Sequence, residues 1–443
     1  MTGTVFQYSQ VDSHTGHSGY SANAQRASGW DGWAVVTGAH MAPPKLVPRL
    51  VQLIHRHGDR APIAKLGQSE RAFWRAQLPS AEAVRAVRAD TVVRLARPGY
   101  VDQHSGGGDD VFGQLTARGL QQMRQRGEDC RRELLKAGGA PALALKRGDV
   151  SKIAVTCTEF NRTLLSAQAF LHGLVLDHSP PPTGHVVIGT RGMDRLVPDP
   201  EPRWPGQAEA EAAVWNSNEV LVREASLVEL HARITSVLER EDQLGPPAAK
   251  PSTPGAPQPS WGRLAEILKC LHSYDRLPSS ISQEDVDAVV GHGAWRWFTL
   301  LSAEHGVVGT ASAPAARALL EACAGAIADV DSPAVRVYSC HDSTLVGIMQ
   351  ALGLHSEASW PAYASVLQLQ LLQSQEIGAS AGASPSRYYL RASLNDQTLT
   401  WLGQSGTSVA TDDGVVVPYE AVRDTLATAF PEATGAFEEI WVR

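Results

Sequence analysis

The sequence has few cysteines, no long hydrophobic run and no excess of basic charge. No run approaches the roughly 18 apolar residues of a membrane span. The net charge of −7 provides no basic field for binding nucleic acid. Five cysteines are few and odd in number, and they show no metal-type pairing, so we expect them to be reduced and mostly structural: Cys130, Cys157, Cys270, Cys323 and Cys340.

The N-terminal region also lacks a secretion signal. Residues 1–43 are rich in Ser, Gly, His and Gln, without a basic start followed by an apolar stretch. A single Arg before Lys45 makes this region a poor transit peptide as well. We expect a flexible tail here, and a protein of the cytoplasm or an organelle rather than a classically secreted one.

The most informative stretch runs from Leu46 to Pro62. Leu46 to His55 is largely apolar and β-rich, which predicts a strand buried on both faces in an α/β protein. The polar run Arg-His-Gly-Asp-Arg-Ala-Pro follows. We expect Gly58 to allow a sharp turn and Pro62 to occupy the first turn of a helix. An imidazole between two guanidinium groups is suited to holding an anion, and a histidine there can attack phosphorus.

Polar residues follow two further predicted strands. A strand over 152–158 passes through Arg162 into a helix over 164–176. Another strand, over 335–340, is followed directly by His341 and Asp342, and then by a helix over 345–352. In open α/β sheets, ligands bind beyond the carboxyl ends of the strands, so these residues are candidates for one site.

The remaining pattern predicts an α/β domain with an insertion. We assign 44–179 and 315–443 to the α/β domain, with Thr116 capping a helix over 117–136 and two paired strands over 366–372 and 387–394. Residues 180–314 would form a helical cap. Its expected helices cover 208–240, 261–272 and 283–303, and its low-complexity loop covers 245–260.

The motif at 56–62, Arg-His-Gly-x-Arg-x-Pro, resembles the signature of the histidine acid phosphatases. The block around Arg162 and the His341-Asp342 pair resemble two further landmarks of that family. The resemblance implies a mixed, mostly parallel sheet flanked by helices, like that of phosphoglycerate mutase, with an inserted cap. It also implies no metal or cofactor, because the arginines supply the positive charge. The implied roles are a nucleophile (His57), a proton donor (Asp342) and a set of phosphate ligands (Arg56, Arg60, Arg162 and His341).

The resemblance implies an acid phosphatase that hydrolyses phosphate monoesters through a phosphohistidine. The run Gly-Gln-Leu-Thr-x-x-Gly-x-x-Gln-Met at 113–123 is most similar to the lysophosphatidic acid phosphatase branch, and the resemblance at Trp360–Ser365 favours the same branch. Lysophosphatidic acid is therefore a candidate substrate, with inositol phosphates such as phytate as an alternative. Two positions depart from the family pattern: Thr156 replaces an arginine and Gln370 replaces a glutamate.

Three other functions remain open. His55-x-His57 with a later His-Asp superficially resembles metallohydrolase ligands, although Arg56 and Arg60 would place cations beside the metal. Thr156 and Gln370 give some weight to a phosphate-binding pseudoenzyme. A phosphoglycerate-mutase-like transferase shares the Arg-His-Gly start, but it normally uses a glutamate acid elsewhere. The expected partner is a small phosphate monoester, and the sequence leaves the oligomeric state open.

Overall fold

The structure is a computed structural model that describes the chain in ten ranges: 45–94, 110–182, 184–190, 196, 206–245, 259–302, 312–355, 360–375, 387–402 and 407–430. The expected tail, residues 1–43, and residues 246–258 of the expected low-complexity loop lie outside these ranges.

A ten-stranded sheet forms the centre of the described chain, and β1 (Leu46–Arg56) lies inside it. β1 is parallel to β5 (Val335–Cys340) and antiparallel to β7 (Val366–Ser374). Leu53 packs on one face of the sheet and Ile54 on the other. The apolar run is therefore buried on both faces, as predicted.

The sheet has a parallel half and an antiparallel half. Beyond β5, the parallel half continues through β3 (Ile153–Cys157), β4 (Val186–Thr190) and β2 (Thr91–Arg94). Beyond β7, the antiparallel half contains β8 (Tyr388–Leu394), β12 (Gly414–Pro418) and β11 (Val409–Thr411), with β9 (Gln397–Thr398) paired to β8. A separate pair consists of β6 (Leu354–His355) and β10 (Thr400–Trp401).

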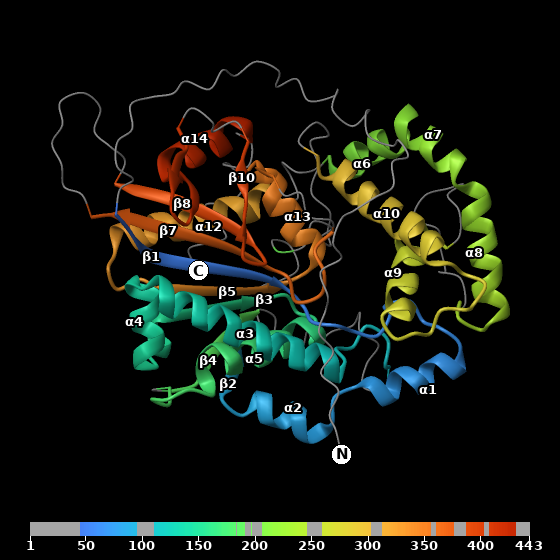
Figure 1. The fold of residues 1–443 in the computed structure, drawn as a ribbon, viewed down its shortest axis with the longest axis horizontal. Helices are drawn as coiled ribbons and strands as arrows, with labels where there is room; N and C mark the ends of the chain where they lie inside the picture. The colour runs from blue at the N-terminus through green and yellow to red at the C-terminus, as the bar shows by residue number, and fades with distance from the viewer. Residues whose placement is uncertain are drawn as a thin grey trace. The chain divides into compact units, whose positions relative to one another are not determined.

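Helices cover both faces of the sheet, which confirms the predicted α/β class (Figure 1). One face carries α12 (Ala313–Ala328), α13 (Asp342–Ala351) and α14 (Tyr419–Ala429). The other carries α2 (Ala81–Arg88), α3 (Ala117–Ala137), α4 (Gly139–Arg147) and α5 (Asn161–Leu171), with a 3-10 turn at Val150–Lys152 and a π turn at His172–Leu176. As predicted, Thr116 caps α3, because its hydroxyl accepts the Gly119 N–H at 3.1 Å.

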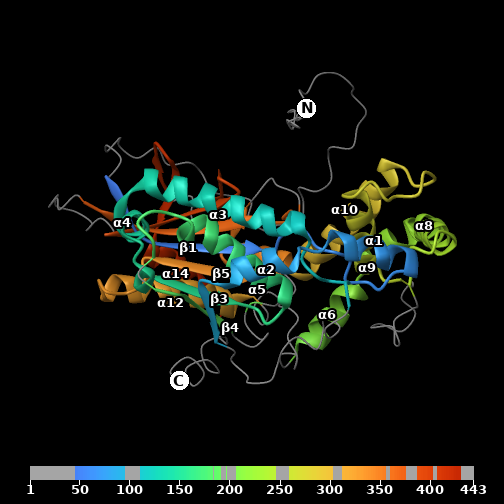
Figure 2. The same ribbon diagram turned by 90° about the horizontal axis from the view of Figure 1, so that it is seen from below.

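The remaining helices form the cap beside the carboxyl end of β1 (Figures 1 and 2). They are α1 (Gln68–Gln77), α6 (Gln207–Trp215), α7 (Asn218–Ser226), α8 (Val228–Arg240), α9 (Trp261–His272) and α10 (Gln283–Leu300). A third hydrophobic core joins α1, α8, α9 and α10. Ala61 and Leu66, from the chain just after β1, belong to this core.

Three differences from the prediction concern the extent of the cap and the segment that leads into it. β4 at Val186–Thr190 belongs to the sheet, so the cap does not begin at residue 180. The cap core includes residues 61–74, which precede the predicted insertion. The expectation that Pro62 opens a helix is wrong, because α1 begins at Gln68.

All five cysteines are free and buried, as expected for reduced structural residues. Cys157 ends β3 and Cys340 ends β5, so both lie at buried strand ends. Within the described ranges, no helix is long and apolar enough to cross a membrane.

Candidate active site

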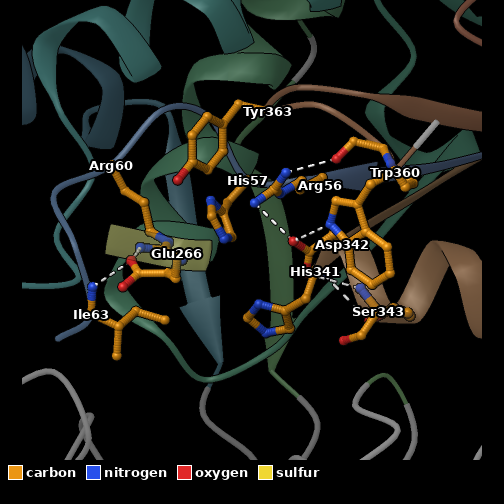
Figure 3. A network of polar contacts seen from close by, with 12 residues as sticks. Arg56, His57, Arg60, Ile63, Glu266, His341, Asp342, Ser343, Trp360 and Tyr363 are labelled. Atoms are coloured by element: carbon orange, nitrogen blue, oxygen red, sulfur yellow. Dashed lines mark hydrogen bonds and ion pairs between the residues drawn. The ribbon is translucent and has the colours of Figure 1, made fainter. Parts of the chain in front are cut away.

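Three neighbouring parallel strands end at the same edge of the sheet, and the predicted site residues follow these ends. β1 leads into the signature loop, β5 leads into His341, and β3 ends five residues before Arg162. The carboxyl ends lie side by side because the strand order is β1, β5, β3. The structure thereby brings together all six predicted residues, of which Figure 3 labels all except Arg162: Arg56, His57, Arg60, Arg162, His341 and Asp342.

The His57 imidazole is oriented by the backbone next to it. Its Nδ1 lies 2.8 Å from the carbonyl oxygen of Gly58. A carbonyl oxygen can only accept a hydrogen bond, so Nδ1 carries the proton and Nε2 keeps its lone pair. The backbone N–H of His57 donates to Cys340 O at 3.0 Å, and its C=O accepts from Ala364 N at 3.1 Å. Both the ring and its backbone are therefore held in place.

The electrostatics of the site keep His57 neutral. Burial lowers its pKa well below the usual value, and the guanidinium groups of Arg162, Arg60 and Arg56 lower it further. The same causes, burial first and Arg162 next, lower the pKa of His341. A neutral imidazole with a free Nε2 lone pair is the form that can attack phosphorus.

Arg56 links the signature loop to the aspartate after β5. Its Nη2 lies 2.8 Å from Asp342 Oδ2, and its Nη1 donates to Pro361 O at 2.7 Å. The Trp360 indole N–H donates to the same carboxylate oxygen at 2.9 Å. Burial opposes ionisation of Asp342, but Arg56, Trp360 and Lys269 together hold its pKa well below the usual range. Asp342 is therefore ionised when the site is empty.

Arg60 is held by a carboxylate of the cap. Glu266, on α9, accepts from Arg60 Nη1 at 2.5 Å and from the backbone N–H of Ile63 at 2.8 Å (Figure 3). Nη1 also donates to Ala61 O at 3.1 Å. Glu266 and Ala61 therefore both accept from Nη1 of Arg60, while Nε is buried and has no acceptor among the described residues.

Arg162 and His341 complete the site on the side of β3. The Arg162 guanidinium carbon lies 4.2 Å from the centre of the Phe160 ring. The same ring packs edge-on against His341, at 5.0 Å between centroids. His341 Nε2 lies 3.1 Å from the Thr158 hydroxyl. Phe160 and Thr158 thus position two of the predicted phosphate ligands.

Close backbone contacts fix the signature loop against α3. A Cβ on Gly58 would lie 2.4 Å from Gly119 O, so the loop requires glycine for this approach. The next residue, Asp59, accepts hydrogen bonds from the hydroxyls of Thr116 at 2.6 Å and Tyr274 at 2.5 Å. Tyr274 follows α9, so the cap is also tied to the signature loop.

The two departures from the family pattern lie on strands of the sheet. Thr156 is in β3, where it pairs with Tyr338 and Gly189. Gln370 is a buried residue of β7. Among the described residues, neither side chain forms a hydrogen bond or ion pair with the six predicted site residues. Arg56, Arg60 and Arg162 already place three guanidinium groups around His57 without an arginine at position 156.

His55 belongs to the core rather than to a ligand set. Its ring stacks on Phe170 at 4.8 Å between centroids, and burial lowers its pKa to about 4. Its Nδ1 lies 3.2 Å from Arg56 O. The described ranges hold no group of three or more His, Cys, Asp or Glu residues arranged to bind an ion. The ligand set of the metallohydrolase hypothesis is therefore not assembled there.

Sequence reasoning assigned no role to four residues at this site. The Tyr363 ring lies beneath the Arg56 guanidinium, with 4.1 Å from the ring centre to Cζ, and 5.7 Å from the His57 ring. Trp360 binds Asp342, while Glu266 and Lys269 reach the site from α9. The aromatic residues lie in a segment, Trp360 to Ser365, that resembled the family. Nothing in the sequence distinguished the two charged residues from other residues of a surface helix.

A cavity of about 170 Å³ opens over the site between the sheet and the cap. Its polar lining consists of Arg56, Arg60, Asp342, Glu266 and Lys269, and its aromatic lining consists of Trp297, Trp360 and Tyr363. Small residues of α9 and α10 complete the wall. The cavity therefore joins two of the predicted phosphate ligands, Arg56 and Arg60, and the predicted proton donor Asp342 to a partly aromatic compartment.

Comparisons with known proteins give the same fold. A curated relative, counting factor 60 of Dictyostelium discoideum, is 23% identical over 404 residues, which are 88% of this chain and 90% of the relative. The solved structure of Hafnia alvei phytase with myo-inositol hexakis sulphate is 16% identical with a TM-score of 0.56, covering 88% of this chain and 99% of that one. Multiple inositol polyphosphate phosphatase of Bifidobacterium longum, with inositol hexasulfate, is 14% identical with a TM-score of 0.53, covering 88% and 94%. At these identities the structural likeness concerns the fold.

The family comparison covers the signature loop. Residues 49–212 match the model of the histidine phosphatase superfamily, branch 2. This segment contains most of β1, all of β2, β3 and β4, and four of the six predicted site residues: Arg56, His57, Arg60 and Arg162. This segment of the chain, with the signature loop, is therefore similar to the histidine phosphatase superfamily, branch 2.

Proposed function

We propose that this protein is a phosphatase that hydrolyses phosphate monoesters through a phosphohistidine formed at His57. One observation supports the proposal most directly: Nδ1 of His57 donates to Gly58 O, which leaves the Nε2 lone pair in a site with three guanidinium groups. Such a site attracts a phosphoryl group and presents a nucleophile to it.

In the proposed first step, His57 Nε2 attacks phosphorus and the bond between phosphorus and the ester oxygen breaks. Arg56, Arg60, Arg162 and His341 hold the phosphoryl oxygens, and Asp342 gives its proton to the departing alcohol oxygen. In the second step, water attacks phosphorus, Asp342 takes a proton from that water, and the P–N bond to His57 breaks. Inorganic phosphate and neutral His57 are restored.

The ion pair of Arg56 with Asp342 has a consequence for the first step. Asp342 must carry a proton to act as an acid, yet Arg56 keeps it ionised in the empty site. A bound phosphate draws Arg56 towards its own oxygens, which returns the pKa of Asp342 towards its ordinary value. Acidic conditions then favour the protonated form, in agreement with an acid phosphatase.

The finer assignment of substrate rests on two different observations. Resemblance at 113–123 and 360–365 favours lysophosphatidic acid. The fold shared with phytases and with an inositol polyphosphate phosphatase gives equal support to inositol phosphates. A substrate panel with phosphate release as the readout would rank the two classes.

Trapping the intermediate tests the proposal. Labelled substrate, quenched without acid, should give an acid-labile, base-stable adduct that is absent in His57→Ala. An acid-stable adduct, or one that persists in that variant, would overturn the assignment of the nucleophile. A phosphate-binding pseudoenzyme would bind inorganic phosphate and form no adduct.

A further inference from the structure

Lys269 is a cation in the cavity that the proposed reaction does not use. It lies on α9, and its Nζ is 5.6 Å from the centre of the Trp360 ring. It lines the cavity together with Arg56, Arg60 and Asp342. Burial lowers its pKa to about 8, with Arg56 as the second cause, so the ammonium remains charged at acidic and neutral pH.

The carboxylates of this cavity are bound to arginines. Asp342 pairs with Arg56 at 2.8 Å, and Glu266 pairs with Arg60 at 2.5 Å. Lys269 forms no ion pair with any residue that the structure describes. Taking an ammonium group out of water costs free energy unless an anion or hydrogen-bond acceptors compensate it. A site cation without such a partner is therefore a candidate ligand for a substrate anion.

We infer that Lys269 binds a second anionic group of the substrate, a carboxylate or a further phosphate, a few bonds from the ester oxygen. This inference rests on the proposed function and narrows its substrate class. Lys269 Nζ lies 5.6 Å from the centre of the Trp360 ring, and the indole N–H of Trp360 donates to Asp342. Asp342 is the group that meets the departing oxygen in the proposed mechanism, and it lines the same cavity, so Lys269 lies on the side of the alcohol part of the ester.

The other walls of the cavity limit what this alcohol can be. Glu266 lies one helical turn before Lys269 and already binds Arg60, so this part of the lining offers a substrate anion no further cation. Trp297 and Trp360 offer apolar surface, and the volume is about 170 Å³. The described part of the cavity thus fits a compact ester with one additional negative charge better than a densely phosphorylated ring.

A matched pair of substrates tests the inference. 3-Phosphoglycerate and sn-glycerol 3-phosphate share a three-carbon skeleton and differ in a carboxylate against a hydroxymethyl group. We expect the native protein to prefer the carboxylate ester, and Lys269→Met to reduce the ratio of the two kcat/KM values by tenfold to a hundredfold, on the order of one charge-assisted hydrogen bond. Lys269→Arg should retain most of the preference. The control Lys146→Met, on the exposed face of α4, should leave the ratio unchanged.

A second pair distinguishes the two kinds of anion. Ethane-1,2-diol bisphosphate is compared with 2-hydroxyethyl phosphate. If Lys269→Met lowers the kcat/KM ratio more in this pair, the preferred group is a phosphate; if it lowers the ratio more in the first pair, the preferred group is a carboxylate. An equal loss on the charged and uncharged esters would overturn the inference, because Lys269 would then hold the transferred phosphate itself. An unchanged ratio in both pairs would also overturn it.

A measurement on the native protein keeps the test valid if Lys269→Met does not fold. The preference for the charged ester should decline as pH rises through about 8, since Lys269 then loses its proton. The charged and titratable groups around Lys269 are Arg56, Arg60, Asp342, Glu266 and Cys270. A constant ratio from pH 6 to pH 9 would contradict the inference. Release of phosphate from p-nitrophenyl phosphate is measured alongside, because its absence would contradict the proposed function instead.

Discussion

Arg56 Nη2 lies 2.8 Å from Asp342 Oδ2, so the residue before His57 controls the charge of the residue after His341. The contact joins the carboxyl ends of β1 and β5. His55 and Cys340 are in contact there, although 285 positions separate them in the sequence. In the proposed mechanism, phosphate and Asp342 share this guanidinium. The protonation of Asp342 for the leaving group would therefore depend on whether Arg56 points to Asp342 or to the phosphate.

The first prediction concerns Asp342→Asn, which keeps the size of the side chain but cannot donate the same proton. An alkyl ester needs that proton, whereas p-nitrophenolate leaves almost unaided. We expect the substitution to slow the burst of enzyme phosphorylation far more with glycerol phosphate than with p-nitrophenyl phosphate. The two slowing factors should differ by about 10²-fold or more. Rapid-mixing measurements of both bursts provide the comparison. Equal slowing would mean that Asp342 only positions its neighbours.

The second prediction concerns the affinity for phosphate. Arg162→Ala should weaken inhibition by inorganic phosphate or vanadate by on the order of tenfold to a hundredfold, the worth of a charge-assisted hydrogen bond. Arg132→Ala serves as the control, because Arg132 is an exposed residue of α3. Inhibition constants of the two variants give the answer. Unchanged inhibition in folded Arg162→Ala would make Arg162 a structural residue.

The third prediction concerns the acid limb of the pH profile. Burial and three arginines lower the pKa of His57, so its lone pair stays available well below pH 6.5. We expect no loss of burst rate with p-nitrophenyl phosphate between pH 6.5 and 5 through protonation of His57. Arg162→Met removes one of the cations, which makes protonation easier and should move the acid limb to higher pH. An acid limb near 6.5 in the native protein would contradict the electrostatic account.

The fourth prediction concerns the fit of the signature loop on α3. Gly58→Ala places a Cβ 2.4 Å from Gly119 O, a backbone atom that has little freedom to move. We expect the free energy of unfolding to fall by about 1–3 kcal/mol, as in other overpacked sites. Gly291→Ala in α10 meets no atom within 4 Å and should stabilise the protein slightly, by roughly 0.5–1 kcal/mol. Denaturant unfolding of both variants measures the contrast.

The sequence predicted the parts of the site that follow strands. Arg56, His57, Arg60, His341 and Asp342 each come within five residues after the last predicted residue of a strand, and parallel strands bring such positions together. The strand over 335–340 and the helix over 261–272 were predicted with the observed bounds. Local apolar patterns and caps were sufficient for these elements.

Contacts made over long sequence distances were not predictable in this way. Glu266 reaches Arg60 across 206 residues, and its position on α9 carries no local sign of that contact. β4 was assigned to the cap, because a short strand between poorly patterned segments has no distinctive period. Pro62 was expected to open a helix from its local preference, but Ala61 enters the cap core and the loop continues to Gly67.

The third hydrophobic core has a consequence for modularity. Ala61, Leu66 and Trp74 come from the segment that follows His57, yet they are buried against α8, α9 and α10. A chain cut at 180 and rejoined at 314 would uncover this apolar surface beside the signature loop and would also remove an inner strand of the sheet. The cap is thus not a removable accessory, and exchanging it between relatives would require transplanting residues 61–74 and 111–112 with it.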